Sequence, residues 1–299
     1  MTIKEIQEWG ISELKKNKVD QPASSASFLL RQILNVEKTY LVSYPDEKIN
    51  LLKERKYKGW IGRRLKHEPV WYITGKIEFF GQDFYVSKNA LIPRPETELL
   101  VEKVLTSSQQ LKVNSRILDM GTGSGAIILT LVNQLESRKQ LTVNKRANSQ
   151  KLMTNDYCAS DISSKALAVA KKNAKNLGLG GKIKFKKGDL FAPWLGQKFD
   201  LIVANLPYIP HEEMPSLSFD LIHYEPRVAL DGGEEGLEVY DRFFRELPFF
   251  LNPKASIFCE IGIDQGKEIK KIIKRPFPKA KINILGDYAS IDRIAIIRT

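Results

Sequence analysis

The sequence predicts an α/β protein built on a doubly wound sheet that is mostly parallel and ends in an antiparallel strand. Apolar residues recur at helical spacing through the first 68 residues, and strand-like and helix-like segments alternate after residue 115. Only Ser290-Ile291-Asp292 separate the last two strand-like segments, INILGDYA and RIAIIRT. So short a connection forces an antiparallel pair, because parallel strands need a long crossover.

Three parts are expected along the chain: a small helical bundle over residues 1–69, a β-hairpin linker over 70–92, and the sheet domain over 93–299. Residues 70–95 are rich in β-branched and aromatic side chains, and Gly81-Gln82 separate IEFF from DFYV, which indicates a hairpin. Pro93 and Pro95 then break regular structure before the helix ETELLVEKVL.

Within the sheet domain, RILDMG, YCASDI, KIKFKKGDL and FDLIVAN read as successive strands. The helices GSGAIILTLVNQL and SSKALAVAKKNAKNL lie between them, and Gly178 closes the second. Residues 133–156 are polar and basic and form a long connection. We expect most of them to be a surface insertion.

Composition indicates a soluble globular protein, with 42% hydrophobic and 27% charged residues. No apolar run approaches the ~18 residues of a membrane span, and the first residues lack a signal pattern. Cys158 and Cys259 stand in apolar contexts, and the three histidines are scattered. We therefore expect reduced thiols, a cytoplasmic protein, no membrane association and no metal site.

The net charge of +12 is spread over the whole chain. Its densest basic stretch is KERKYKGWIGRRLK (53–66). Such a run is either a solvated helix face or a docking surface for RNA or an acidic protein. Aromatic residues interleave only sparsely there, so we expect no stable nucleic-acid partner.

A glycine turn marks the candidate cofactor site. In ILDMGTGSGAI, Gly121 to Gly125 (with Thr122, Gly123 and Ser124 between them) lie where a strand turns into a helix. Glycines let the backbone approach a ligand beside a helix N-terminus. The spacing also fits the loose dinucleotide fingerprint, so the motif alone admits a nicotinamide cofactor or S-adenosylmethionine.

Carboxylates favour S-adenosylmethionine. Asp119 precedes the turn, where it can attract the cationic end or sulfonium of that cofactor, and would be poorly placed beside a pyrophosphate. Asp161 ends the second strand, positioned for a ribose diol or, alternatively, for helix capping. Asp189 follows the third strand, near an adenine. All three are expected at strand carboxyl ends, where doubly wound sheets bind ligands.

The stretch FDLIVANLPYI places Asn205, Leu206, Pro207 and Tyr208 at the same edge. Methyl transfer to a planar nitrogen is difficult because its lone pair is delocalised. A site can help by accepting both N–H hydrogens, one on the Asn205 side-chain oxygen and one on a nearby backbone carbonyl. Pro207 would stiffen the turn, and Tyr208 offers a flat face for stacking. The alternative is that these residues form only an ordinary turn at the end of a strand.

Over almost the whole chain the sequence closely resembles the release factor glutamine methyltransferases of the HemK/PrmC family. The motifs that carry the resemblance include IPRPETE (92–98), ILDMGTGSGAI, FDLIVANLPYI, EPRVAL (225–230) and EIGIDQG. The resemblance implies a Rossmann-like methyltransferase sheet and methyl transfer from S-adenosylmethionine to the glutamine amide of the Gly-Gly-Gln motif in peptide chain release factors.

The resemblance also implies residue roles. Asn205 and the Leu206 carbonyl would hold the glutamine NH2 with Tyr208 against it, and Asn205 would also border the cofactor. The glycine turn, Asp161 and Asp189-Leu190 would bind the cofactor. Arg94 and Thr97 would close the site, while Glu225 and Arg227 would shape the substrate channel. The helical domain and the hairpin would contact the release factor, and we expect a monomer.

The sequence departs from the family pattern at two points, and two alternative functions stay open. The family motif is usually Asn-Pro-Pro-Tyr, and Leu206 replaces the first Pro; because a carbonyl is what the chemistry asks for, we expect retained activity. The insertion lengthens the spacing from Gly121 to Asp161, so the ribose assignment depends on the SDIS context. The alternative functions are an adenine-amino methylase acting on DNA or RNA, and a non-catalytic, cofactor-binding translation adaptor.

Overall fold

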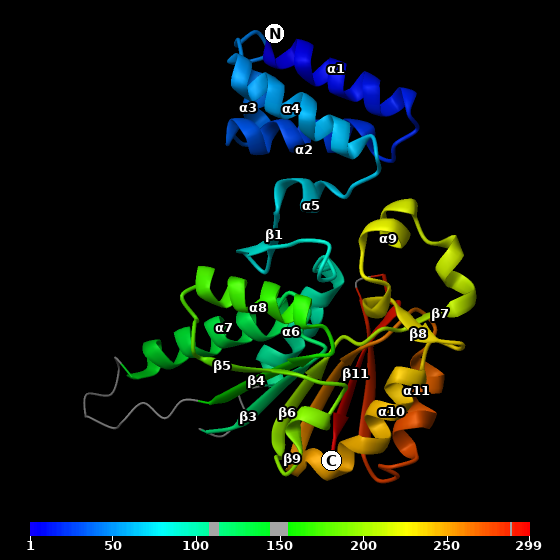
Figure 1. The fold of residues 1–299 in the computed structure, drawn as a ribbon. Coiled ribbons are helices and arrows are strands. Elements are labelled where there is room, and N and C mark those ends of the chain that lie inside the picture. The colour runs from blue at the N-terminus through cyan, green and yellow to red at the C-terminus, as the bar shows by residue number, and fades with distance from the viewer. Residues whose placement is uncertain (108–113, 144–154, 288) are drawn as a thin grey trace. The chain divides into compact units, whose positions relative to one another are not determined.

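The computed structural model describes residues 1–107, 114–143, 155–287 and 289–299 (Figure 1). Contacts divide the chain into two compact units. The first comprises Met1–Lys76 together with Ser218–Tyr224, and the second comprises Ile77–Leu217 and Glu225–Thr299. No helix within the described ranges has the length and apolar character needed to cross a membrane.

The first unit is helical, as predicted. Its elements are α1 (Ile3–Lys16), α2 (Pro22–Leu34), α3 (Lys38–Ser43), α4 (Leu51–Arg64), α5 (Val70–Thr74) and, from the later segment, α9 (Phe219–Tyr224). Thr2 and Glu5 form a reciprocal capping box at the start of α1. Apolar residues from α1, α2 and α4, such as Ile6, Leu30 and Ile61, close one core.

The later segment of this unit was not foreseen. Residues 218–224 leave the sheet unit and join the helical one. Arg64 of α4 is buried and pairs with Asp220 at 2.5 Å. The Tyr224 hydroxyl donates to the carbonyl oxygen of Lys66 at 2.5 Å. These side-chain contacts link residues more than 150 positions apart, which local sequence patterns do not encode.

A hairpin, β1 (Lys76–Phe79) and β2 (Gln82–Tyr85), starts at the last residue of the first unit's opening segment and continues into the second unit. A hairpin was predicted for this region, with two differences. The preceding residues Val70–Thr74 form helix α5, and the turn is centred on Phe80 and Gly81, both with positive φ. The expected helix is α6 (Pro95–Ser107), which begins at the second proline of the pair.

A seven-stranded sheet forms the body of the second unit, in the order β10-β11-β9-β6-β3-β4-β5. Its strands are β3 (Arg116–Met120), β4 (Asp156–Asp161), β5 (Ile183–Lys187), β6 (Phe199–Ala204), β9 (Leu251–Glu260), β10 (Lys281–Gly286) and β11 (Asp292–Arg298). Only β11 runs antiparallel to its neighbours, which confirms the predicted doubly wound fold with an antiparallel last strand.

Helices cover the sheet as Figure 1 shows, with α7 (Ala126–Val143) and α8 (Ser164–Asn176) toward one side and α10 (Glu238–Glu246) and α11 (Gly266–Lys274) toward the other. The helix before the expected insertion over 133–156 was predicted to end too early. Helix α7 continues to Val143, and β4 begins at Asp156. Residues 144–154 lie outside the described part of the chain.

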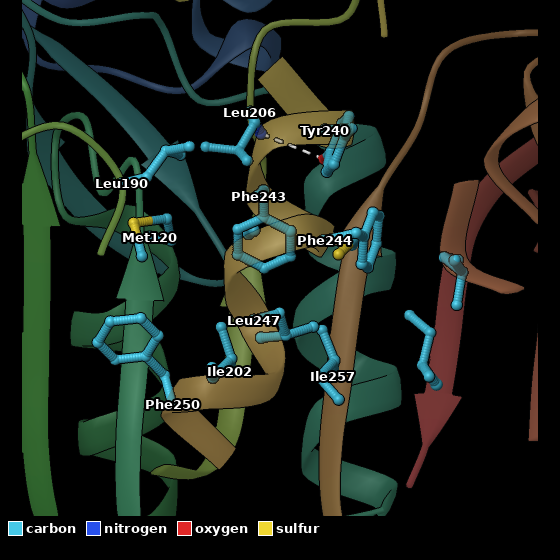
Figure 2. Close-up of a cluster of buried hydrophobic side chains, with 14 of the residues drawn as sticks. Met120, Leu190, Ile202, Leu206, Tyr240, Phe243, Phe244, Leu247, Phe250 and Ile257 are labelled. Atoms are coloured by element: carbon cyan, nitrogen blue, oxygen red, sulfur yellow. Dashed lines mark hydrogen bonds between the residues drawn. The ribbon is translucent and has the colours of Figure 1, made fainter. Parts of the chain in front are cut away.

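One core lies between the sheet and α10, and Figure 2 shows its side chains. Phe243, Phe244 and Leu247 pack toward Ile202 of β6 and Ile257 of β9. Leu206 points toward Leu190 at the upper end of this cluster. Both cysteines, Cys158 and Cys259, are buried and unbridged, as predicted for core thiols.

Candidate functional site

The candidate site lies at the carboxyl ends of the parallel strands. After β3, β4 and β5 the chain returns to the other side of β3 to form β6, so the strand order reverses between β3 and β6. Doubly wound sheets bind ligands at such a reversal. A cavity of about 240 Å³ lies there, lined among others by Gly121, Asp161, Asp189, Leu190, Asn205 and Leu206.

The glycine turn after β3 has a left-handed backbone. Gly121 and Gly123 have φ values of +71° and +56°, and both line the cavity. A Cβ on Gly121 would meet Leu206 Cδ2 at 3.0 Å. Absence of a side chain at Gly121 therefore lets the turn approach the Asn205–Tyr208 segment closely.

Gly125 serves packing. Its φ is +82°, and a Cβ there would meet Leu129 Cδ1 at 2.9 Å and Ala170 Cβ at 3.2 Å. Gly125 thus lets α7 approach α8. Thr122 and Ser124 are buried within the turn. Within the five-residue stretch, Gly121 and Gly123 line the cavity, whereas Gly125 allows close helix packing.

Asp119 is fully buried under the turn. The Thr122 hydroxyl donates to Asp119 Oδ2 at 2.6 Å, while Oδ1 has no hydrogen-bond partner among the described residues. Burial raises the pKa of Asp119 to about 7, while the bond from Thr122 and the nearby Ile128 backbone N–H act against that rise. A buried acceptor without a partner is costly, and a nearby cationic ligand would lower that cost.

Asp161 ties the end of β4 to the glycine turn. Its Oδ2 accepts from the Gly123 N–H at 2.9 Å, and its Oδ1 accepts from the Ser163 N–H at 2.8 Å. The helix cap itself is Ser163, whose hydroxyl oxygen accepts from the Ala166 N–H. Burial raises the pKa of Asp161. Asp161 therefore sits beside the cavity and is not the capping residue of α8.

Asp189 and Leu190 follow β5 and also line the cavity. Asp189 pairs with Arg242 of α10. Leu190 is buried with a φ of +41°, an unusual backbone for a leucine. The pair presents a carboxylate beside an apolar side chain, which suits a polar ring lying against an apolar wall.

Hydrogen bonds hold the Asn205–Tyr208 segment from several elements. Asn205 Nδ2 donates to Thr97 Oγ1 of α6 at 3.2 Å. The Leu206 N–H donates to the Tyr240 hydroxyl of α10 at 3.3 Å, the bond dashed in Figure 2. The Tyr208 hydroxyl donates to Glu260 Oε1 at 3.3 Å. The segment is thus fixed by three separate parts of the unit.

The same segment borders two hollows. Asn205, Leu206 and Pro207 line the 240 Å³ cavity. Tyr208 lines an open groove of about 950 Å³, together with Gly262 and Gln265. Gln265 Nε2 donates to the Tyr208 carbonyl oxygen at 2.8 Å. A group entering along the groove and a ligand in the cavity would therefore reach opposite ends of one rigid turn.

Glu260, at the end of β9, is a site residue that sequence reasoning did not assign. Its Oε2 accepts from Thr97 Oγ1 at 2.7 Å, and it is almost completely buried. Burial raises its pKa, and the hydrogen bonds from Thr97 and Tyr208 oppose the rise, as does the nearby Asn205 amide. A carboxylate after the apolar run SIFC is the signal that could have found it, once β9 had been recognised as a strand.

Arg94, Glu225 and Arg227 lie in different settings. Arg94 pairs with Glu225 at 2.5 Å, and the Ile92 N–H donates to the same carboxylate at 3.1 Å. Glu225 is buried, so this pair ties the IPRPETE segment to the EPRVAL segment. Arg227 is exposed and pairs with Asp231 at 3.1 Å, and it is not among the residues that line the 240 Å³ cavity.

The site fits S-adenosylmethionine. Gly121 and Gly123 form a backbone cradle, Asp161 and Asp189 supply carboxylates at the rim, and Leu190 supplies an apolar wall. Asp119, two residues before Gly121, is buried, and its Oδ1 accepts no hydrogen bond from the part of the chain that the structure describes. This combination of donors, carboxylates and apolar surface suits a cofactor that carries a positive charge, a ribose and an adenine.

Comparison with known proteins gives the same picture. Residues 5–75 match the PrmC N-terminal domain, and residues 111–226 match a methyltransferase domain. The release factor glutamine methyltransferase of Bacillus cereus is 35% identical over 298 residues, covering 98% of each chain. That of Clostridium acetobutylicum is 34% identical, covering 99% of this chain and 98% of its own.

Solved structures share the fold. The hMettl16 catalytic domain, in complex with the MAT2A 3'UTR hairpin 1, superposes with a TM-score of 0.52 at 15% identity. The match covers 86% of this chain and 84% of that one. At this identity the likeness shows a common sheet architecture and nothing about the substrate.

Proposed function

We infer the function of this chain from its family. The chain belongs to the release factor glutamine methyltransferase family, and it is an S-adenosylmethionine-dependent methyltransferase. Its proposed reaction is transfer of a methyl group to the side-chain amide nitrogen (N5) of the glutamine in the Gly-Gly-Gln motif of peptide chain release factors. The observation that carries the proposal is the Asn205–Tyr208 turn, held rigidly beside the glycine cradle.

The turn suits an amide nitrogen as acceptor. An amide NH2 has two hydrogens in one plane, and methyl transfer requires the nitrogen face to point at the methyl group. Asn205 Oδ1 and the Leu206 carbonyl can each accept one hydrogen. Pro207 has no N–H, so no backbone donor from that residue competes beside the Leu206 carbonyl. Positioning of this kind can contribute ~7–11 kcal/mol without a strong base.

Tyr208 would supply the stacking face. Its hydroxyl donates to Glu260, and its backbone carbonyl oxygen accepts from Gln265. These two hydrogen bonds fix both the side chain and the backbone of Tyr208. A fixed ring loses little entropy when a planar amide stacks on it. Leu206 contributes its backbone to the substrate and its side chain to the apolar core.

For the cofactor, the proposed contacts are the glycine turn, Asp161 and Asp189-Leu190, with Asp119 acting from beneath. S-adenosylmethionine supplies an electrophilic methyl group on a positively charged sulfur. The buried carboxylate of Asp119 favours positive charge near the turn, while Asp161 and Asp189 can accept hydrogen bonds from hydroxyl and amino groups. Asn205 lies at the boundary between the cofactor and the substrate.

On the substrate side, we propose that the helical domain and the hairpin contact the release factor. Arg94 and Thr97 would close the site, and Glu225 and Arg227 would shape the entrance. Of these, Thr97 has the most direct support, since it hydrogen-bonds Asn205. The basic stretch 53–66 lies largely on α4 and supplies positive charge to the helical unit. A monomer and a cytoplasmic location complete the proposal.

A panel of substrates tests the proposed function. The protein is incubated with methyl-labelled S-adenosylmethionine and, in parallel, with a release factor, duplex DNA or RNA. Label is expected in the release factor, on the peptide that contains Gly-Gly-Gln. Label on nucleic acid with none on that glutamine would instead identify an adenine-amino methylase. No label in any arm, with the cofactor bound, would indicate a non-catalytic adaptor.

A further inference from the structure

We propose that Glu260 is a positioning residue that acts through the Thr97 hydroxyl and sets which end of the Asn205 amide faces the substrate. The inference deepens the proposed function and rests on it. It starts from three residues on three elements, namely Glu260 at the end of β9, Thr97 in α6 and Asn205 after β6, which the fold brings into one hydrogen-bonded chain.

Each link of this chain has a defined direction. A carboxylate accepts hydrogen bonds and donates none. Thr97 has a single hydroxyl hydrogen, and it points to Glu260 Oε2 at 2.7 Å. With that hydrogen committed, the Thr97 oxygen can only accept toward Asn205. The 3.2 Å contact between them must therefore come from the amide NH2 group.

The orientation of Asn205 follows. If Nδ2 faces Thr97, Oδ1 faces away from it and remains an acceptor. Asn205 lines the cofactor cavity, so this acceptor is available at the edge where the substrate amide must sit.

A reversed amide would oppose the reaction. With Nδ2 toward the substrate, the site would present donors to a group that has only hydrogens to offer on its nitrogen. An asparagine can rotate between these two orientations with little change in shape, so packing alone selects weakly between them. A buried anion on one side selects strongly, because hydrogen bonds to charged groups are the stronger ones.

Burial explains why Glu260 serves this role and does not contact substrate. Its residue is 2% exposed, and both carboxylate oxygens already accept hydrogen bonds, from Thr97 and from Tyr208. The Tyr208 bond orients the stacking ring, so one carboxylate positions both side chains of the turn. Thr97 is similarly buried, at 4% exposure.

The test compares variants that each remove a different hydrogen bond from the series Glu260–Thr97–Asn205. Thr97→Val keeps the shape but loses the hydroxyl, and Glu260→Met keeps a similar length but loses the acceptor. Each is expected to lower kcat for release-factor methylation about 10- to 100-fold, while the cofactor Kd stays within about threefold of the wild type. The kcat of the double variant should be about equal to that of the less active single variant, because both changes interrupt the same series of hydrogen bonds.

Two further variants separate positioning from general damage. Thr97→Ser restores the hydroxyl and should recover most of the activity that Thr97→Val loses. Thr106→Val makes the same substitution on an exposed position of α6, where the hydroxyl donates to the Glu102 carbonyl oxygen, and should leave kcat unchanged. If Glu260→Met does not fold, the Val, Ser and Thr106 variants still decide.

Outcomes are distinct for the two proposals. A wild-type protein that leaves the glutamine unmethylated contradicts the proposed function. Methylation by the wild type, with Thr97→Val and Glu260→Met both retaining full kcat, contradicts only the positioning role. Additive losses in the double variant, or a cofactor Kd that weakens in step with kcat, would also overturn it, since they indicate a general loss of structure.

Discussion

At the residue scale, the site depends on hydrogen-bond direction and on burial more than on residue identity alone. Leu206 shows this most simply. Its N–H donates to the Tyr240 hydroxyl and its side chain packs in the core, while its carbonyl is the group we propose to accept from the substrate amide. The replacement of the usual family proline therefore leaves the required acceptor in place and adds apolar packing near Leu190 and Gly121.

Leu206→Ala should separate these two contributions. The side chain is almost completely buried, and its removal leaves a cavity, so the free energy of unfolding should fall by roughly 2–5 kcal/mol. The backbone acceptor survives, so kcat should fall far less than in Asn205→Ala. Denaturant unfolding and steady-state methylation measure the two effects. A large loss of kcat with unchanged stability would contradict this assignment.

Asp119 predicts a pH dependence of stability. Because burial raises its folded-state pKa from the usual 3.8 to about 7, the folded protein holds a proton that the unfolded chain releases. Its contribution to stability is complete below about pH 4 and is lost as the pH rises through about 7. Asp119→Asn removes this dependence.

The measurement is the difference in unfolding free energy between wild type and Asp119→Asn in the absence of cofactor. This difference should shift against the wild type by up to roughly 4 kcal/mol between pH 4 and pH 7.5, from about 1.4 kcal/mol per pKa unit. Parallel curves for the two proteins across that range would show that Asp119 titrates normally in the folded state.

At the element scale, the sequence predicted the elements with the clearest local signals. The glycine turn, the alternating strands and helices from residue 115, and the last antiparallel pair are confirmed. Strand β9 was not predicted because its second to fourth residues, Asn252-Pro253-Lys254, are typical of a turn, and Lys254 has a φ of +64°. Without β9, Glu260 had no place at the sheet edge.

The site contacts that the sequence did not predict are made between residues far apart along the chain. Sequence placed Asn205 and Tyr208 at a strand end, but their partners Thr97 and Glu260 are 108 and 52 residues away along the chain. No local periodicity encodes such pairs. The end of α7 was misjudged for a different reason, since its polar residues after 133 resemble a loop while remaining helical.

Gly125 and Gly178 provide a matched test at this scale. Both have left-handed backbones, with φ of +82° and +69°. Alanine at Gly178 meets open space and should cost only about 1–2 kcal/mol of backbone strain. Alanine at Gly125 adds overlap with Leu129 and Ala170, worth a further ~1–3 kcal/mol. Equal destabilisation in thermal unfolding would contradict the packing role of Gly125.

At the scale of the whole molecule, the chain forms two units, and the helical unit includes a segment from the second half of the sequence. Residues 218–224 return from the sheet unit to complete the helical one, so the unit depends on a contact distant in sequence. The Arg64–Asp220 pair is the electrostatic part of that contact, and the Arg64 side chain is only 6% exposed. A buried guanidinium without its partner is strongly destabilising.

Asp220→Ala should therefore destabilise the helical unit by up to about 3–5 kcal/mol. Glu268→Ala is the matched control, because its pair with Lys271 is exposed on both sides and should contribute less than about 1 kcal/mol. Calorimetry of both variants measures the effect. A loss no greater than the control's would mean that the segment adds little to the stability of the helical unit.

We propose that the Asn205–Tyr208 turn presents acceptors to the glutamine amide while the cofactor binds independently beside it. The most direct test of this proposal is mass spectrometry of the Gly-Gly-Gln peptide after reaction with wild type and with Asn205→Ala, each with its cofactor Kd measured. One methyl group on that glutamine is expected with the wild type, and a rate at least about 100-fold lower with Asn205→Ala at nearly unchanged cofactor affinity. Methylation at an undiminished rate by Asn205→Ala would contradict the account.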